Sequence, residues 1–212
     1  MARAALISNP VVPKDRIESL SDAVFAIVAT LLVIELKVPH IQPAGGALAL
    51  AHGLFETAPK VGSFILSFLI VTVSWVNHHQ ILVNLKYCDR HLLWINGFFL
   101  LCVSFVPFPA ATLGEYPTNP TAIVFYGIAN SVLAAAFVLM RVYISRCAGM
   151  SKIEHTRVHH RQALQRSLVA PLLYALGIIV AFWAPIVSWI FFLAVPAHFA
   201  LPATNETPDN KP

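Results

Sequence analysis

The stretch RIESLSDAVFAIVATLLVIELKVP, residues 16–39, decides the fold that this sequence can adopt. It is mainly apolar over residues 17–38, and its charged side chains lie near the two ends and at Asp22. About 20 mainly apolar residues, each adding ~1.5 Å of helical rise, cross the ~30 Å hydrocarbon core of a bilayer. The stretch therefore predicts a helix that spans a membrane.

Asp22 is the unusual residue of this predicted helix. An ionised carboxylate below the membrane surface costs a few kcal/mol or more, so we expect Asp22 to point into the bundle and to have polar partners. Side chains of suitable chemistry occur near the expected cytoplasmic ends of the first three spans, at Arg16, Ser21, His78, His79 and Asn96. We predict a polar network among them, in which Asp22 has either a functional or a purely structural role.

The composition of the whole chain is that of an integral membrane protein. Hydrophobic residues make up 58% and charged residues 11% of the chain, whereas soluble domains are about 25% charged. The 212 residues allow one domain, over residues 1–200, and no second Arg-x-x-x-x-Ser-Asp stretch indicates a duplication. The polar, Pro-containing residues 201–212 are expected to form a disordered cytoplasmic tail.

Apolar runs predict an all-α bundle of six transmembrane helices. Their approximate bounds are 16–39, 61–82, 92–113, 121–144, 168–183 and 186–199. Pro107 and Pro109 should kink or unwind the end of the third span. A further apolar piece at 47–55 is expected at the membrane interface, and the sixth span is short enough to be tilted or partly interfacial.

The basic residues predict the orientation of these spans. With both termini in the cytoplasm, all 14 Lys and Arg residues except Lys37 and Lys60 fall on the cytoplasmic side, in agreement with the positive-inside rule. The basic run at 145–166 is then a cytoplasmic loop near anionic lipid headgroups, and no nucleic acid partner is expected. Cys88 and Cys147 should be cytoplasmic and Cys102 intramembrane, with no disulfide framework.

Three large aliphatic residues share one face of the first span. At ~100° per residue, Ile27, Leu31 and Ile34 lie within a sector of about 60°, and Asp22 lies roughly 140° from Ile27. Every membrane helix contains such side chains. From the residues alone, lipid contact or ordinary core packing is the simpler interpretation of this face.

The residues around Asp22 also carry a family resemblance. Arg16, followed after three residues by Leu20, Ser21 and Asp22, resembles the first-helix signature Arg-x-x-x-Phe-Ser-Asp of the transmembrane protein 175 family of potassium channels, with Leu20 in place of Phe. Further residues of this chain resemble the second and third helices of that family, namely Trp75, His78, His79, Asn96 and the run 106–109. The resemblance covers about half of the chain with specific residues and adds Trp75 to the predicted polar network.

This resemblance implies a potassium-selective channel, without a cofactor, in the cell membrane. The first helices of several subunits, most simply four, would line one pore. Ile27, Leu31 and Ile34 would then form its constriction, with Thr30 adjacent. Apolar rings can act as a gate or filter by excluding water, which reverses the simpler interpretation of that face.

Two other classes of function stay open. His155, His159 and His160 include an i, i+4 pair suited to a metal, as in a membrane-bound di-iron oxidoreductase. That chemistry needs further histidine boxes, which His78 and His79 alone do not supply. A proton-coupled carrier that uses Asp22 is the other alternative.

Overall fold

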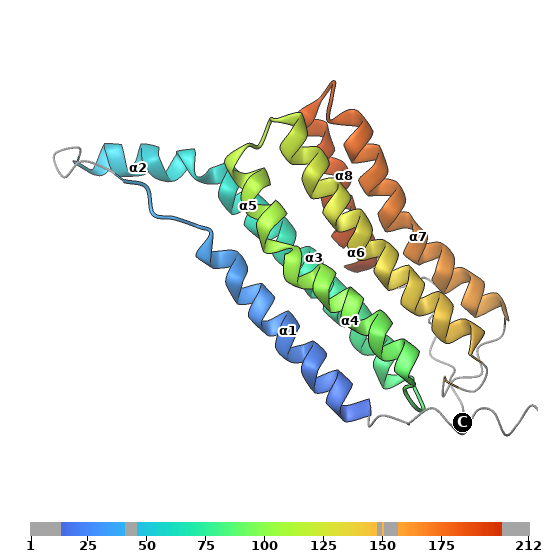
Figure 1. Cartoon of the computed structure of the whole chain (residues 1–212). Coiled ribbons are helices and arrows are strands. Elements are labelled where there is room, and N and C mark those ends of the chain that lie inside the picture. The colour runs from blue at the N-terminus through green and yellow to red at the C-terminus, as the bar shows by residue number, and fades with distance from the viewer. Residues whose placement is uncertain (1–13, 41–45, 148–149, 151–156, 201–212) are drawn as a thin grey trace, which may run out of the picture.

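The computed structural model describes residues 14–40, 46–147, 150 and 157–200, and it is an all-α structure (Figure 1). Side-chain surroundings are described for these residues except 157–161. The helices are α1 (Lys14–Ile34), α2 (Gly46–Glu56), α3 (Ala58–Val83), α4 (Arg90–Phe105), α5 (Pro107–Glu115), α6 (Pro120–Arg146), α7 (Arg157–Val180) and α8 (Pro185–Ala200). The predicted tail at 201–212 lies outside the described residues.

Five helical segments of the described chain are long and apolar enough to cross a bilayer. They are Lys14–Ile34, Ala58–Val83, Arg90–Glu115, Pro120–Arg146 and Gln162–Val180. The protein is therefore a multi-pass membrane protein. The sixth predicted span corresponds to α8, whose 16 residues reach only ~24 Å at 1.5 Å per residue, so it is shorter than a full span.

Proline and capping residues set several helix ends. The Asn119 side chain accepts a hydrogen bond from the Thr121 amide at 2.9 Å, and Pro120 occupies the first turn of α6. The third predicted span is interrupted where the sequence predicted it, because α4 ends at Phe105 and α5 begins at Pro107. Proline at the start of α5 lacks the N–H that a continuous helix would need.

The first helix ends earlier than the sequence predicted. Apolar composition predicted helix as far as Val38, but α1 ends at Ile34. A turn in which the Leu36 amide donates to the Val33 carbonyl at 3.0 Å closes it. Pro39 disfavours the helical conformation at Val38, so it opposes any extension of the helix to the predicted end.

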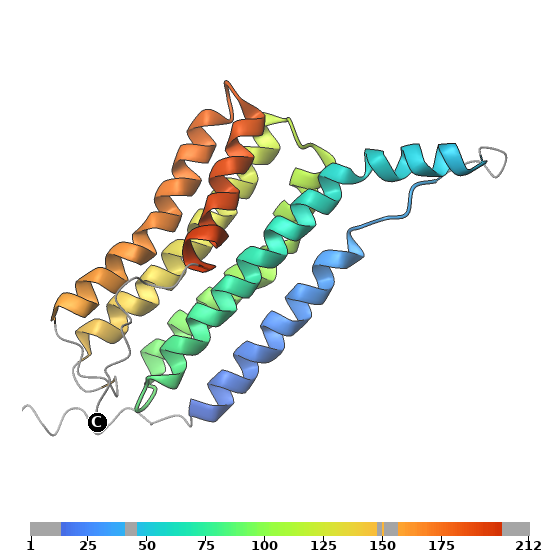
Figure 2. The same cartoon turned by 180° about the vertical axis from the view of Figure 1, so that it is seen from behind.

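The helices form a bundle with α1 at one edge and α7 at the other, as both views show (Figures 1 and 2). α1, α4 and α7 begin, and α3 and α6 end, at the same end of the bundle. We call this the basic end, because Lys14, Arg90 and Arg146 lie there. α2 projects away from the bundle, and α8 stops partway towards the basic end (Figure 2).

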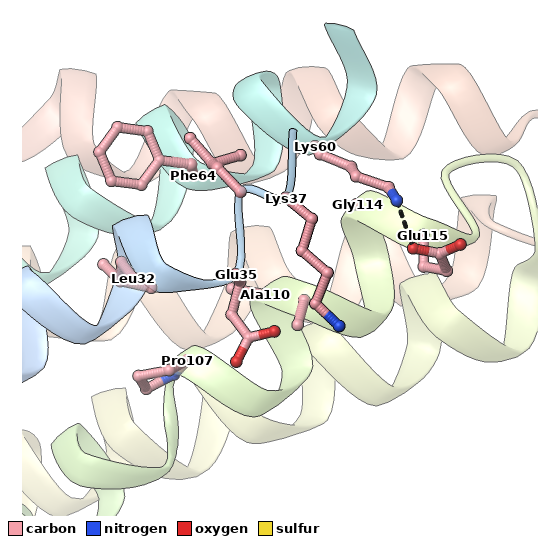
Figure 3. A pocket seen from close by; sticks show the side chains of 11 residues that line it. Leu32, Glu35, Lys37, Lys60, Phe64, Pro107, Ala110, Gly114 and Glu115 are labelled. Carbon is pink, nitrogen blue, oxygen red and sulfur yellow. Dashed lines mark ion pairs between the residues drawn. The ribbon is translucent and has the colours of Figure 1, made fainter. Parts of the chain in front are cut away.

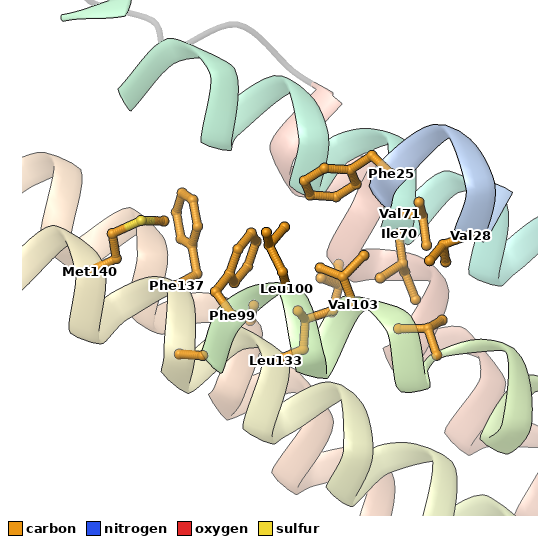
Figure 4. Packing of buried hydrophobic residues seen from close by; sticks show 14 of the residues in the cluster. Phe25, Val28, Ile70, Val71, Phe99, Leu100, Val103, Leu133, Phe137 and Met140 are labelled. Atoms are coloured by element: carbon orange, nitrogen blue, oxygen red, sulfur yellow. The ribbon is translucent and has the colours of Figure 1, made fainter. Parts of the chain in front are cut away.

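Apolar side chains from α1, α3, α4 and α6 fill the interior (Figure 4). Phe25, Phe99 and Phe137 follow one another across it, with successive ring centroids 6.0 and 5.9 Å apart. α6, α7 and α8 pack closely through two glycines. A Cβ added at Gly127 would lie 2.5 Å from an atom of Ile178, and one added at Gly177 would lie 2.5 Å from an atom of Phe192. Small residues therefore set the spacing of these helices.

Candidate functional site

α1 presents two faces of different exposure. Ser21, Phe25, Val28 and Leu32 are buried against the bundle. The residues predicted to form a constriction lie on the other face, where Ile27 is 58%, Leu31 41% and Ile34 66% exposed, with Thr30 also exposed. The helix at the edge of the bundle is thus packed on one side only, and the described chain leaves its aliphatic face uncovered.

A buried hydrogen-bond chain joins α1 to α3 and α4. The His78 Nε2 atom lies 2.7 Å from the Asn96 Oδ1 atom, and the Asn96 Nδ2 group donates to the Ser21 Oγ atom at 3.3 Å. Ser21 in turn donates to the Ile17 carbonyl of its own helix at 2.8 Å. Since Asn96 accepts through Oδ1, His78 is the donor, with its proton on Nε2. We call Ser21, Asn96 and His78 the buried triad.

Aromatic rings enclose this triad. The His78 ring stacks on Phe99 with centroids 5.2 Å apart and 12° between their planes, and Phe25 lies 5.8 Å away on α1. His78 and Asn96 are only 1% and 3% exposed. The triad is therefore a buried polar connection between three helices, in which every member has a hydrogen-bond partner.

Asp22 has one partner from the predicted network, the residue that the family resemblance added to it. Its Oδ1 atom accepts a hydrogen bond from the Trp75 indole Nε1 at 2.8 Å, rather than from Arg16 or a histidine. Trp75 is 39% exposed and Asp22 is half-buried. Asp22 thus lies at the edge of the contact between α1 and α3, not in the centre of the bundle as expected.

His79 approaches a carboxylate that the sequence analysis did not include. Its Nδ1 atom lies 3.3 Å from the Glu18 Oε1 atom without the geometry of a hydrogen bond, and its ring stacks on Trp75 at 5.9 Å. Glu18 precedes Asp22 by one helical turn, which is the sequence signal that could have identified it. Arg16 is exposed.

A small polar cavity at the opposite end from the basic end was also not predicted. It has a volume of about 70 Å³, between the segment after α1 and the helices α3 and α5 (Figure 3). Glu35 and Lys37 line it together with Lys60 and Glu115, whose charged groups lie 2.6 Å apart. Because these residues are distant in sequence, only the packing of α3 on α5 brings them together.

The histidine cluster falls largely outside the described structure. His155 is not among the described residues, and His159 and His160 belong to the first turn of α7, where side-chain surroundings are not described. Within the described residues, no group of three His, Cys, Asp or Glu side chains is placed to hold a metal ion.

The fold and this geometry define an α-helical, multi-pass membrane protein whose first helix carries an exposed aliphatic face. The family described as "Endosomal/lysosomal potassium channel TMEM175" matches residues 16–107. That match contains α3, α4, all of α1 except its first two residues, and every residue of the buried triad. The family is one of channels, not of enzymes.

Individual relatives extend the match over most of the chain. A Chryseobacterium protein named a potassium channel is 30% identical over 191 residues, which are 89% of this chain and 93% of that protein. A Streptomyces collinus protein, also named a potassium channel, is 36% identical over 62% of this chain, and the match spans less than two thirds, 64%, of its length.

A solved structure has the same fold. The crystal structure of a potassium-selective channel TMEM175 homologue from Chamaesiphon minutus has a TM-score of 0.68 and 32% identity, and the match covers 88% of this chain and 96% of that one. The chain belongs to the TMEM175 family.

The buried triad predicts a specific dependence of stability on Asn96. Asn96→Leu removes both of its side-chain hydrogen bonds and leaves the buried His78 without a partner, so we expect a loss of about 1–3 kcal/mol. Thermal unfolding of the detergent-purified protein measures it.

Asn77→Leu is the matched control, because within the described residues the Asn77 side chain bonds to the Val73 carbonyl of its own helix and to no other group. It should lose less than about 1 kcal/mol. Equal destabilisation by the two substitutions would show that the triad does not anchor α1.

Proposed function

We propose that this chain is a subunit of a potassium-selective cation channel of the cell membrane, with six membrane-inserted helices and both termini in the cytoplasm. The observation that carries the proposal is the uncovered aliphatic face of α1, on the helix that holds the family signature. The relatives named as potassium channels support the choice of ion.

One copy of the chain encloses no pathway along α1, because this helix lies at the edge of the bundle. Closed rotational symmetry would bring the same face of each copy around one axis. Four copies, with Ile27, Leu31 and Ile34 directed inward, would cover this face and form successive apolar rings. A homotetramer is therefore the proposed assembly.

The rings would act as a hydrophobic constriction. Where a pore lined by aliphatic side chains is narrow, water is expelled and a hydrated cation meets a barrier. The Thr30 hydroxyl, beside these rings, donates to the Ile27 carbonyl at 2.7 Å. Its oxygen can still accept, so it offers an ion or water a lone pair but no free proton.

The buried triad and the pair formed by Asp22 and Trp75 would hold the pore helix in position. Both connect α1 to α3, and the triad also reaches α4. Because their hydrogen bonds fix the rotation of α1 about its own axis, they would decide which residues face the pore. This role is structural, and it does not require any residue of the triad to be ionised.

A flux assay tests the channel proposal directly. Proteoliposomes containing the purified chain should pass potassium down an imposed gradient, and should pass sodium more slowly under the same conditions. Empty liposomes are the control. An absence of potassium flux from correctly assembled protein would contradict the proposal, and bound iron would instead favour the oxidoreductase alternative.

The constriction predicts an effect of polar substitution. In Ile27→Asn, each copy would add an amide to the same ring, so water would re-enter the constriction. Single-channel recording should show a higher conductance and weaker discrimination between potassium and sodium.

Ile179→Asn on α7 is the control, since Ile179 is 55% exposed at the other edge of the bundle. It should affect folding or insertion but leave the conductance of each channel unchanged. If the two substitutions gave the same conductance and selectivity, the face of α1 would be lipid-facing and the constriction proposal would fail.

Cys147 provides a test of orientation. It follows the end of α6 at the basic end and is half-buried. A membrane-impermeant maleimide should label it in inverted membrane vesicles and not in intact cells. Labelling from outside the cell would reverse the proposed topology.

Cys88 is less suitable for this test than the sequence suggested. It is fully buried, and this burial raises the pKa of its thiol, so it reacts slowly as a thiolate near neutral pH. Cys88→Ser and Cys102→Ser can be combined so that Cys147 alone reports the orientation.

A further inference from the structure

The guanidinium group of Arg141 lies near the basic end and has no acidic partner among the described residues. Arg141 precedes the last residue of α6 by five positions, or ~8 Å along the helix. Its Nε atom is buried and has no hydrogen-bond partner in the described chain. Its guanidinium lies over the Phe137 ring at 5.3 Å, and no described carboxylate forms an ion pair with it.

A second positive charge lies close to it on α7. The charges of Arg141 and Arg166 are near enough to act on one another. The Arg166 Nη2 atom is 3.4 Å from the carbonyl oxygens of His198 and Phe199, in the last turn of α8. The end of α8 thus shares the charge of Arg166, whereas Arg141 retains a buried donor that nothing described accepts.

An apolar cavity continues from this pair towards the middle of the bundle. It has a volume of about 50 Å³ and lies between α3, α4, α6, α7 and α8. Phe137, which contacts Arg141, and Phe199, whose carbonyl faces Arg166, both line it. Figure 4 shows Phe137 beside Phe99 and Leu133, which line the same cavity. The cavity and the two arginines are therefore contiguous.

The geometry points to a binding site for an anionic phospholipid of the leaflet at the basic end, with its phosphate on Arg141 beside Arg166 and part of one acyl chain in the adjoining cavity. This site lies on the other half of the bundle from α1 and does not rest on the proposed conduction pathway.

Two features favour a lipid over a soluble anion. Both arginines belong to helices of membrane-spanning length, so the site is reached from the bilayer. A phosphate alone would contact only the guanidinium groups. The cavity beside them has an apolar lining that only a hydrocarbon chain would use, formed by Phe137, Phe199, Ala134 and Pro196. Basic pockets between membrane helices bind anionic headgroups in this way.

Binding of radiolabelled dioleoylphosphatidylglycerol to the detergent-purified full chain tests the site, with dioleoylphosphatidylcholine as the neutral lipid. Wild-type protein should prefer the anionic lipid. Arg141→Met keeps an apolar contact with Phe137 and removes the charge, and should weaken that binding about tenfold, as loss of a charge-assisted hydrogen bond would. Arg146→Met, at the exposed end of α6, should leave it unchanged.

A second pair of variants tests the cavity and stays informative if Arg141→Met does not fold. Ala134→Leu fills the cavity and should weaken binding, whereas Ala135→Leu, on the exposed side of the same helix, should not. Elution volume in gel filtration confirms folding of each variant. Equal affinity within either pair, or displacement of the lipid by inorganic phosphate at the same concentration, would overturn the proposal.

Discussion

Polar groups inside the hydrocarbon core of a membrane must find partners within the protein, and the buried triad meets this constraint for three helices at once. His78 and Asn96 are almost fully buried, and each would be costly without the other. Asn96 reaches Ser21 with its remaining amide donor, so α1 is held against α3 and α4 in one rotation about its axis. Together with the hydrogen bond between Asp22 and Trp75, this contact orients the residues of α1 relative to the bundle.

The one-sided packing of α1 is the main consequence. With Ser21 and Phe25 turned inward, Ile27 and Leu31 are turned away from their own bundle. In a bilayer, an aliphatic face of this kind is stable against lipid or against other copies of the chain, because the hydrophobic effect does not distinguish the two. The channel that we propose, assembled around α1, would use the second arrangement and would give that face a function.

The half of the bundle formed by α6, α7 and α8 is built on a different principle. It holds together through close helix approach at Gly127 and Gly177, and two of its arginines, Arg141 and Arg166, lie near the basic end. α8 stops partway towards that end (Figure 2), and its last turns line the apolar cavity beside Arg141 and Arg166. The two halves thus divide the roles of forming the pore and contacting the surrounding lipid that we propose for them.

Composition and hydropathy predicted the class of protein and the order of the helices, and the predicted polar network included Trp75 but not Glu18. Hydropathy and proline positions depend on local chemistry, so the interruption at Pro107 and the shortness of α8 could be predicted from them. The family resemblance likewise placed Asp22, Trp75, His78 and Asn96 in one predicted polar network. The predicted end of α1 lies further along the chain than the observed end, because composition alone does not show where a turn closes a helix.

Only the tertiary structure decided which of these residues are partners. Asp22 bonds to Trp75, His78 to Asn96 and His79 lies beside Glu18, because the rotation and register of α3 against α1 select among several donors of similar chemistry. The cavity beside Arg141 likewise depends on where α8 stops against α6 and α7. Such contacts join residues far apart in the chain, and no periodicity within one helix specifies its rotation relative to another.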